Sequence, residues 1–363
     1  MEMKDYRPIA CCNVLYKVVS KILANRLKGL LPRVITENQS AFVKGRLLIE
    51  NVLLASELVK KYHKEEVSPR CVMKIDISKA FESVQWSFVL KSLEALGVPE
   101  KFNGDLAGYF QSTRGLRQGC SLSPYLFVLC MNVLSHKIDK AVEQGKFKFH
   151  PQCKELSLTH LCFADDLMVF VEGFKESIEG ALSVFDEFAV WSGLFISIEK
   201  STIYMACVSV EEKGRILANF SFADGDLPVR YLGLPLMTQG MKKQDFLPLV
   251  KKIRSRINSW TCRFISYAGR LQLIKSVLMS IVNFWAGVYR LPSKCMKEIE
   301  QLCSSFLWYG PELKSTGAKV AWRDIYKLQN EGGLGIRPLK EVNIVYGLKL
   351  IWRMLTGVSL WGK

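Results

Sequence analysis

Two adjacent aspartates, Asp165 and Asp166, interrupt an otherwise apolar stretch at residues 161–170. Runs rich in Val, Phe and Leu are typical of buried strands, and aspartate favours turns. The stretch therefore predicts a hairpin with two carboxylates at its tip. Adjacent carboxylates repel each other and are costly to desolvate, so a positive partner should lie beside them. A divalent cation fits that role because hard cations prefer carboxylate oxygen, and a solvated acidic turn is the alternative.

Composition and charge narrow the class of protein. The length of 363 residues and the hydrophobic content of 49% indicate a globular chain of several domains. The formal net charge of +16 indicates a polyanionic partner, and nucleic acid is a better candidate than a membrane surface. Residues 1–8 lack the apolar core of a signal peptide, and no apolar run is as long as a membrane span. The eleven cysteines form no C-x-x-C pair, so we expect reduced core thiols in an intracellular protein.

A third aspartate stands near the end of a predicted strand. In residues 71–77 the apolar side chains at odd positions share one face, while Lys74 and Asp76 share the other. A helix that carries Phe81 follows at once, so Asp76 alone would also fit an acid at a helix N-terminus. The separation of 89 residues between Asp76 and Asp165 allows the strand and the hairpin to be neighbours in one antiparallel sheet. Three converging carboxylates would hold two Mg²⁺ ions roughly 3.5–4 Å apart, as in nucleotidyl transfer.

The surrounding chain is mostly helical. Apolar spacing and capping residues predict helices at residues 15–32, 48–62, 124–142, 175–191, 243–260, 267–289 and 292–308. We expect a strand pair on either side of residues 199–201, and a loop at 332–336 before a final helix rather than a phosphate loop. Asn103 and Gly104 form a hairpin signal whose first strand is missing. This indicates that residues have been lost near 102–103.

A polar loop with flanking glycines spans residues 114–124. Arg117 and Gln118 offer donors that suit phosphate, sugar or base groups, and Gly119 lets the backbone approach a ligand closely. Ser123 fits the N-cap and Pro124 the first position of the following helix.

The motifs, in their order, resemble those of reverse transcriptases, in particular the enzymes of plant non-LTR (LINE-type) retrotransposons. The matching stretches are residues 6–9, 38–46, 76–81, 114–124, 163–166, 192–194 with Lys200, and 230–235. The resemblance covers nearly the whole chain and implies an α+β fold of the right-hand polymerase type, partly truncated. It implies fingers at 1–70, an antiparallel-sheet palm at 71–240 (the reverse transcriptase domain ending near 236), a helical thumb at 241–310 and a truncated helical extension at 311–363.

The resemblance also implies residue roles. Asp76, Asp165 and Asp166 would be catalytic metal ligands for two Mg²⁺ ions, with Mn²⁺ as a substitute. The residues implied to contact the incoming nucleotide are Phe81, Arg117, Gln118, Gly119 and Lys200. Phe81 would exclude a 2′-hydroxyl, or it is a core aromatic; Lys200 would approach the triphosphate, or it is a solvated turn lysine. The residues implied to contact nucleic acid are Arg7, Lys44, Arg46, Arg230, Lys251, Lys252 and Arg256.

The implied function is RNA-directed DNA polymerisation in the nucleus, with an RNA template, a DNA primer and dNTPs as partners and no membrane. Glu82 stands where aspartate is more usual, but it keeps the negative charge, so we expect little effect from it. The segment between Asp76 and Gln118 is also shorter than expected. A catalytically impaired remnant that binds nucleic acid without polymerising is therefore the alternative. The intact set of acids favours the polymerase, and the incomplete hairpin and the abrupt C-terminus favour the remnant.

Overall fold

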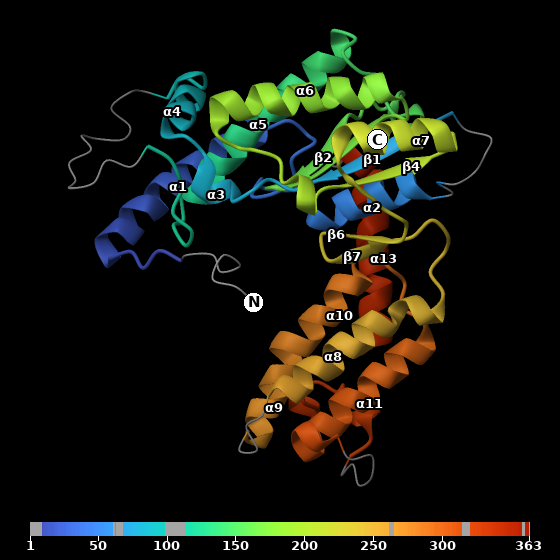
Figure 1. Ribbon diagram of the computed structural model, residues 1–363. Helices are drawn as coiled ribbons and strands as arrows, with labels where there is room; N and C mark the ends of the chain where they lie inside the picture. Colours follow the sequence, from blue (N-terminus) through green and yellow to red (C-terminus); the bar gives the residue numbers. More distant parts are fainter. Residues whose placement is uncertain are drawn as a thin grey trace. The chain divides into compact units, whose positions relative to one another are not determined.

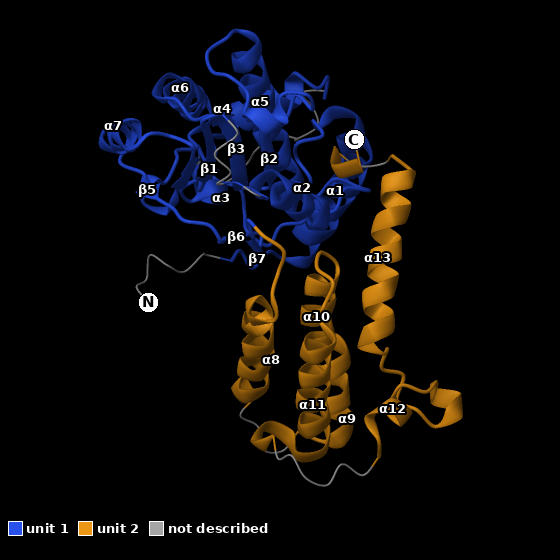
Figure 2. Cartoon of the chain, turned by 90° about the vertical axis from the view of Figure 1, so that its right-hand side faces the viewer, with its two compact units in different colours: residues 1–238, 363 blue, residues 239–362 orange. Residues whose placement is uncertain are grey.

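The chain folds into two compact units in a computed structural model (Figures 1 and 2). The structure describes residues 9–60, 62, 68–98, 113–260, 265–313, 320–357 and 360–362. The first unit spans residues 1–238 and the second 239–362, so the boundary lies two residues before the start expected for the thumb. The finer division into fingers, palm, thumb and extension stays a prediction. The hairpin signal at residues 103–104, with its expected loss of residues, lies outside the described residues.

A five-stranded sheet forms the centre of the first unit, in the order β2-β3-β1-β4-β5. Its strands are β1 (Arg70–Ile75), β2 (His160–Phe163), β3 (Asp166–Glu172), β4 (Thr202–Ala206) and β5 (Ala223–Asp224). β1 is antiparallel to β3 and β4, β2 is antiparallel to β3, and β5 runs parallel to β4. The expected pairing of the strand before Asp76 with the acidic hairpin is confirmed, and so is the α+β fold class.

The two faces of the sheet have different covers. Figure 1 shows α5 (Ser123–Glu143) and α6 (Lys175–Ser192) over one face and α2 (Leu48–Val59) on the other side. Met73 and Ile75 of β1 are buried with Phe127 of α5 in the main hydrophobic core. Because side chains alternate along a strand, Lys74 and Asp76 face away from that core, as the strand pattern predicts.

The other elements of the first unit lie around this sheet. They are α1 (Val14–Val34), α3 (Ala80–Ser83), α4 (Trp86–Glu94), α7 (Val210–Phe220), β6 (Val229–Tyr231), β7 (Leu234–Leu236) and the 3₁₀ turns Pro151–Cys153 and Ile198–Lys200. β6 and β7 form a hairpin whose turn residues, Leu232 and Gly233, have φ values of +49° and +85°. Two positive φ values are typical of the tight turns that suit strand twist.

Several expected boundaries were wrong. The first helix does not end at Pro32, because the proline removes only one backbone donor and the Ile35 N–H still donates to Leu31. The helix after Asp76 is broken between α3 and α4, since the Gln85 N–H donates to the Ser192 carbonyl at 2.8 Å instead of continuing a helix. α5 begins at Ser123 itself, one residue early.

The expected strand pair around residues 199–201 is a single strand. Residues 198–200 form a 3₁₀ turn before β4, and the preceding segment contributes only an isolated bridge between Ile196 and Ile77. The hydrogen bonds of that segment go to the region around Asp76 rather than to β4, so no hairpin forms there. α7 and β5 have no counterpart in the sequence prediction.

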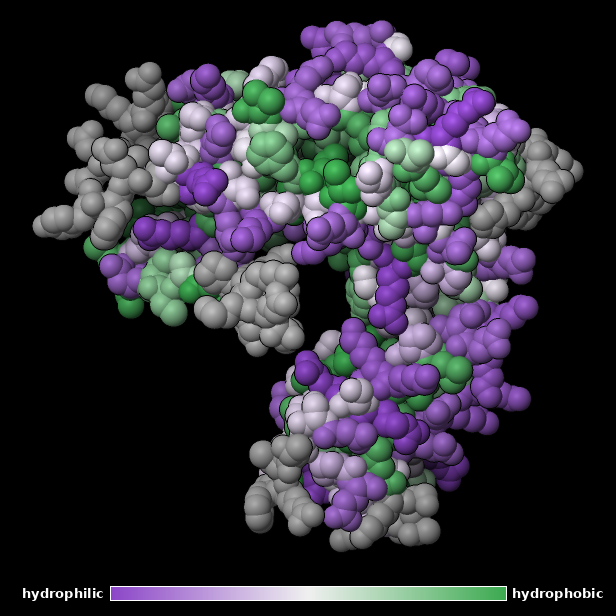
Figure 3. Space-filling model, viewed as in Figure 1, coloured by the Kyte–Doolittle hydropathy of each residue, from purple (hydrophilic) through white to green (hydrophobic). Residues whose placement is uncertain are grey.

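The second unit is helical. Its elements are α8 (Leu247–Ser259), α9 (Tyr267–Leu273), a π-helical segment (Ile274–Leu278), α10 (Met279–Ala286), α11 (Ser293–Tyr309), α12 (Trp322–Ile325), α13 (Leu339–Leu355) and the 3₁₀ turns Lys243–Phe246, Gly310–Glu312, Gln329–Glu331 and Leu360–Gly362. Residues 332–336 are a loop before α13, as predicted. The visible surface of the second unit is largely hydrophilic (Figure 3). Among the described residues, no helix is long and apolar enough to cross a membrane.

Candidate active site

The three acids lie at one end of the sheet. The pairing of β1 with β3 runs through Lys74 opposite Met168 to Ile75 opposite Leu167. Continued by one residue, this register sets Asp76 opposite Asp166, the first residue of β3. Residues opposite each other in an antiparallel pair have Cα atoms about 4.5–5.5 Å apart and side chains on the same face. Asp165 lies in the turn between β2 and β3.

Exposure and electrostatics agree with an acidic site that is accessible to solvent and lies near buried groups. Asp76 and Asp165 are half-buried and Asp166 is exposed. Burial raises the pKa of the Cys162 thiol in β2, and the charges of Asp165 and Asp166 raise it further. Burial likewise raises the pKa of the Tyr231 hydroxyl in β6, with a smaller effect from the Asp166 charge. The acids therefore lie within electrostatic reach of both Cys162 and β6.

The donor set suits magnesium only in part. Across the described ranges, the side chains gather no group of three or more His, Cys, Asp or Glu that could hold a metal ion. Magnesium in substrate-assisted sites needs only one or two protein carboxylates, because waters and substrate phosphates complete its octahedral shell. Half-buried Asp76 and Asp165 at adjoining strand ends meet that smaller requirement. The expected convergence of all three acids stays a prediction.

The backbone of Asp76 is held by the turn that carries Lys200. Buried Ser201 accepts a hydrogen bond from the Asp76 N–H at 3.0 Å and donates to the Ser197 carbonyl at 2.8 Å. The Ser197 N–H in turn donates to the Asp76 carbonyl at 2.8 Å. Exposed Lys200 precedes this anchor directly. The sequence prediction named Lys200 but missed Ser201, a small polar residue at a buried position next to a matching motif.

The connector at residues 38–46 docks along the outer edge of β2. Cys162 accepts a backbone hydrogen bond from Ser40 at 3.0 Å and donates one to Asn38 at 2.9 Å. The half-buried Arg46 guanidinium donates to the carbonyls of Ile35 at 2.7 Å, Gln39 at 2.6 Å, and Thr36. Burial lowers its pKa. These hydrogen bonds hold residues 35–46 in a compact conformation. The side chain of Lys44, in contrast, is exposed.

The loop at residues 114–120 packs against α3. The Leu116 N–H donates to the Phe81 carbonyl at 2.6 Å. The half-buried Phe81 ring stacks on Phe127 with centroids 4.6 Å apart, so it packs against the core while part of the side chain stays accessible. The loop also approaches the start of the first helix. Gly119 has a φ of +94°, and Gln118 accepts a backbone hydrogen bond from Ala10 at 2.9 Å.

The remaining predicted contacts are spread over both units. The Arg117 guanidinium lies 4.9 Å from the ring centroid of Tyr16, a cation–π arrangement. Arg230 is exposed on β6, and its carbonyl accepts a hydrogen bond from the Lys74 ammonium at 3.1 Å. This bond fixes β6 on the sheet face that carries Asp76. Arg7 lies outside the described residues.

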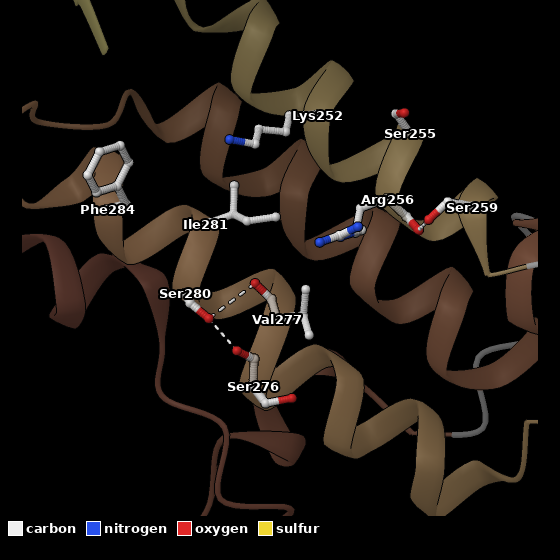
Figure 4. A pocket seen from close by; sticks show the side chains of 9 residues that line it. All are labelled: Lys252, Ser255, Arg256, Ser259, Ser276, Val277, Ser280, Ile281 and Phe284. Carbon is white, nitrogen blue, oxygen red and sulfur yellow. Dashed lines mark hydrogen bonds between the residues drawn. The ribbon is translucent and has the colours of Figure 1, made fainter. Parts of the chain in front are cut away.

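A groove in the second unit runs between α8 and the helix that continues through the π-helical segment (Figure 4). Its volume is about 610 Å³, and it is lined by Lys252, Ser255, Arg256, Ser259, Ser276, Val277, Ser280, Ile281 and Phe284. Lys252 and Arg256 are exposed and project from one side of α8, as expected for residues four apart. Lys251 is exposed but does not line this groove.

Comparisons with known proteins point to mobile elements. An uncharacterised 149 kDa protein of transposon TX1 from Xenopus laevis is 24% identical over 97% of this chain and 28% of its own length. A putative 115 kDa protein in the type-1 retrotransposable element R1DM of Drosophila melanogaster is 27% identical over 70% of this chain and 25% of its own length. The chain thus spans less than a third of the length of these relatives.

The solved structures that resemble this chain do so only weakly. An apo telomerase from Candida tropicalis aligns over 90% of this chain and 55% of its own, with 13% identity and a TM-score of 0.40; this likeness is too weak to support an assignment. The family model described as reverse transcriptase (RNA-dependent DNA polymerase), in contrast, matches residues 2–236. That match covers well over half of the chain and contains all three acids. The chain therefore belongs to the reverse transcriptase family, and it has the α+β fold expected from its sequence.

Proposed function

We propose that this chain is an RNA-directed DNA polymerase that extends a DNA primer on an RNA template. The observation that supports it most is the register of β1 with β3, which ends with Ile75 opposite Leu167 and, continued by one residue, sets Asp76 opposite Asp166. Family membership supports the same reaction. The similarity to proteins of retrotransposable elements supports such an element as the source, and a plant origin and nuclear action stay expectations.

In the proposed reaction, the primer 3′-oxygen forms a bond to the α-phosphorus of a dNTP while the bond from that phosphorus to the pyrophosphate oxygen breaks. Two Mg²⁺ ions, or Mn²⁺ in their place, would supply activation of the hydroxyl and charge neutralisation of the leaving group. Asp76, Asp165 and Asp166 provide the carboxylate ligands. Their half-buried to exposed positions leave the carboxylates accessible from solvent.

The other predicted residues take supporting roles in this proposal. Gln118 and Gly119, with Arg117 beside them, line the incoming nucleotide, and the half-buried Phe81 contacts its sugar. Lys200 stands on the turn anchored to Asp76 and approaches the triphosphate. The nucleic-acid contacts proposed from the sequence are Arg7, Lys44, Arg46, Arg230, Lys251, Lys252 and Arg256. For Arg46 the backbone contacts above describe a second, structural role.

Primer extension tests this proposal. Purified protein is mixed with a labelled primer on an RNA template, dNTPs and Mg²⁺, and product length is read on a gel. We expect extension by the unsubstituted chain and by Asp186→Asn, a control on the exposed face of α6, but none by Asp165→Asn. Template binding without extension by the unsubstituted chain would instead support the alternative, an impaired remnant that binds nucleic acid.

A further inference from the structure

The side chain of Gln39 is fully buried and bonded at both ends of its amide. Its Oε1 accepts hydrogen bonds from the N–H groups of Ala41 at 2.9 Å and Ala164 at 3.0 Å. Its Nε2 donates to the Sγ of Cys162 at 3.0 Å and to the carbonyl of Ala164 at 3.5 Å. One side chain thus binds both backbone polar groups of the residue that precedes Asp165.

Ala164 needs such support. Its φ is +56°, in the left-handed region that a residue with a Cβ occupies only when its surroundings hold it there. The Phe163–Asp166 pair holds the turn on the strand side. On the other side the Cys162 thiol donates to the Ala164 carbonyl at 3.1 Å, and the Gln39 amide bonds both that carbonyl and the Ala164 N–H as well as the Cys162 sulfur. Because the Ala164 carbonyl belongs to the peptide plane that leads into Asp165, a fixed carbonyl also fixes the direction in which Asp165 leaves the turn.

The connector that carries Gln39 is itself held in place. Arg46 donates to the Gln39 carbonyl at 2.6 Å, and Gln39 forms a parallel bridge with Cys162. Asn51 adds a hydrogen bond from its side chain to the Cys162 carbonyl at 3.1 Å. The Gln39 amide therefore starts from a backbone that is fixed on both sides, and it can transmit that fixed position to the turn.

We propose that Gln39 is a positioning residue for Asp165: its amide holds the Ala164 peptide so that Asp165 meets the divalent cation together with Asp76. This inference rests on the proposed function, because it needs a metal ion at these acids. Groups that orient a metal ligand typically change metal affinity or activity about 10–100-fold when they are removed. We expect an effect of that size from Gln39 although its side chain touches neither substrate nor metal.

Two measurements test the proposal. Gln39→Met keeps the length of the side chain and removes all of its amide hydrogen bonds. Hydrogen exchange of the metal-free chain should be faster at the Ala164 amide in this variant. Binding of Mn²⁺, followed by electron paramagnetic resonance with a primed RNA template and dNTP present, should be about 10–100-fold weaker. If folding of this variant fails, Gln39→Asn keeps an amide one methylene shorter and should shift both readouts in the same direction.

Ser40→Ala is the matched control. It removes the hydrogen bond at 2.5 Å from the Ser40 hydroxyl in the same connector to Asn51 in α2, but it removes none of the hydrogen bonds of the Gln39 amide. We expect it to lower thermal stability without changing exchange at Ala164 or Mn²⁺ binding. Unchanged exchange at Ala164 and unchanged Mn²⁺ binding in the Gln39 variants would overturn the proposal. It would also be overturned if Ser40→Ala weakened Mn²⁺ binding as much as the Gln39 variants do.

The outcomes separate this inference from the proposed function. If the unsubstituted chain binds Mn²⁺ through Asp165 but extends no primer, the positioning role stands and polymerisation fails. If the unsubstituted chain binds no Mn²⁺ through Asp165, the metal site and the positioning role both fail. Faster exchange at Ala164 would then show only that Gln39 stabilises the turn.

Discussion

The acidic end of the sheet and the basic groove of α8 are built in different ways. At the sheet, buried polar side chains from distant parts of the sequence, Gln39 and Ser201, hold the backbone beside Asp165 and Asp76. In the groove, exposed cations such as Arg256 come from neighbouring turns of one helix. The difference corresponds to two tasks: metal chemistry needs ligands at fixed positions, while a polyanion is attracted by charge at many positions.

This contrast predicts two kinds of response to substitution. Removing one partner of a buried hydrogen bond leaves the other partner unsatisfied, so the loss is concentrated at one place. Removing an exposed cation reduces binding by a small and additive amount. Substitutions at the sheet should therefore change the rate of chemistry, and substitutions in the groove should change affinity and its dependence on salt.

The largest effect is expected from Asp76→Asn. The neutral amide keeps the shape of the side chain but loses the charge that binds a cation, so extension should fall by about 10³-fold or more, on the scale of several kcal/mol of metal stabilisation. Binding of primed template, measured by fluorescence anisotropy, should stay close to that of the unsubstituted chain. Extension at an undiminished rate would remove Asp76 from the proposed site.

A smaller effect is expected from Ser201→Ala, which leaves the Asp76 N–H and the end of β1 without their side-chain partner. Loss of a buried hydrogen bond typically costs about 1–3 kcal/mol. We expect a lower free energy of unfolding in urea and a lower kcat with little change in the KM for dNTP. Ser183→Ala in α6, where the hydroxyl bonds only within its own helix, is the control. Equal kinetic effects of the two variants would argue against a specific role for Ser201.

Substitutions in the groove should change how nucleic-acid affinity depends on salt concentration. In Lys252→Gln/Arg256→Gln, two cations are lost, so the slope of log affinity against log salt should fall by about two. The maximal extension rate at saturating template should be unchanged, in contrast to the sheet variants. Lys297→Gln, an exposed lysine of α11 that does not line the groove, should keep the slope. An unchanged slope in the double variant would show that Lys252 and Arg256 do not contact the nucleic acid.

The smallest effect is expected from Glu187→Gln on α6. Hydrogen bonds from Lys146 at 2.7 Å and Lys137 at 3.0 Å lower the pKa of Glu187 to about 2. A lowered pKa in the folded state adds stability above the ordinary value of 4.5, and this stability is lost as the pH falls towards 2. Because Glu187 is exposed, the gain at pH 7 should be at most about 1 kcal/mol. Melting temperatures of the two proteins should converge by pH 2 and in high salt. A constant difference would contradict this account.

The sequence was sufficient for the features that follow from local pattern. The acidic hairpin, the strand before Asp76, the helix that ends at Gly193 and the long helices of the second unit all follow from periodicity and turn residues. These features were predictable because each depends on residues that are close together in the chain.

Tertiary contacts explain what the sequence could not predict. The break before α4 depends on the bond from Gln85 to Ser192, which lie far apart in the sequence. The inward direction of Arg46 depends on three carbonyls that lie 7 to 11 residues away and meet only in the folded conformation of the connector. The bonds of Gln39 to Ala164 join residues 125 positions apart. No local pattern distinguishes a buried glutamine that holds a turn from one that is solvated.

The central claim is that Asp76 and Asp165 bind the same divalent cation. The most direct test is a Mn²⁺ titration, followed by electron paramagnetic resonance in the presence of primed template and dNTP, of Asp76→Asn, Asp165→Asn and the double variant. Since one shared site is destroyed by the loss of either ligand, each single variant should lose nearly as much binding as the double variant. Independent, additive losses, or full Mn²⁺ binding by Asp76→Asn, would contradict the claim.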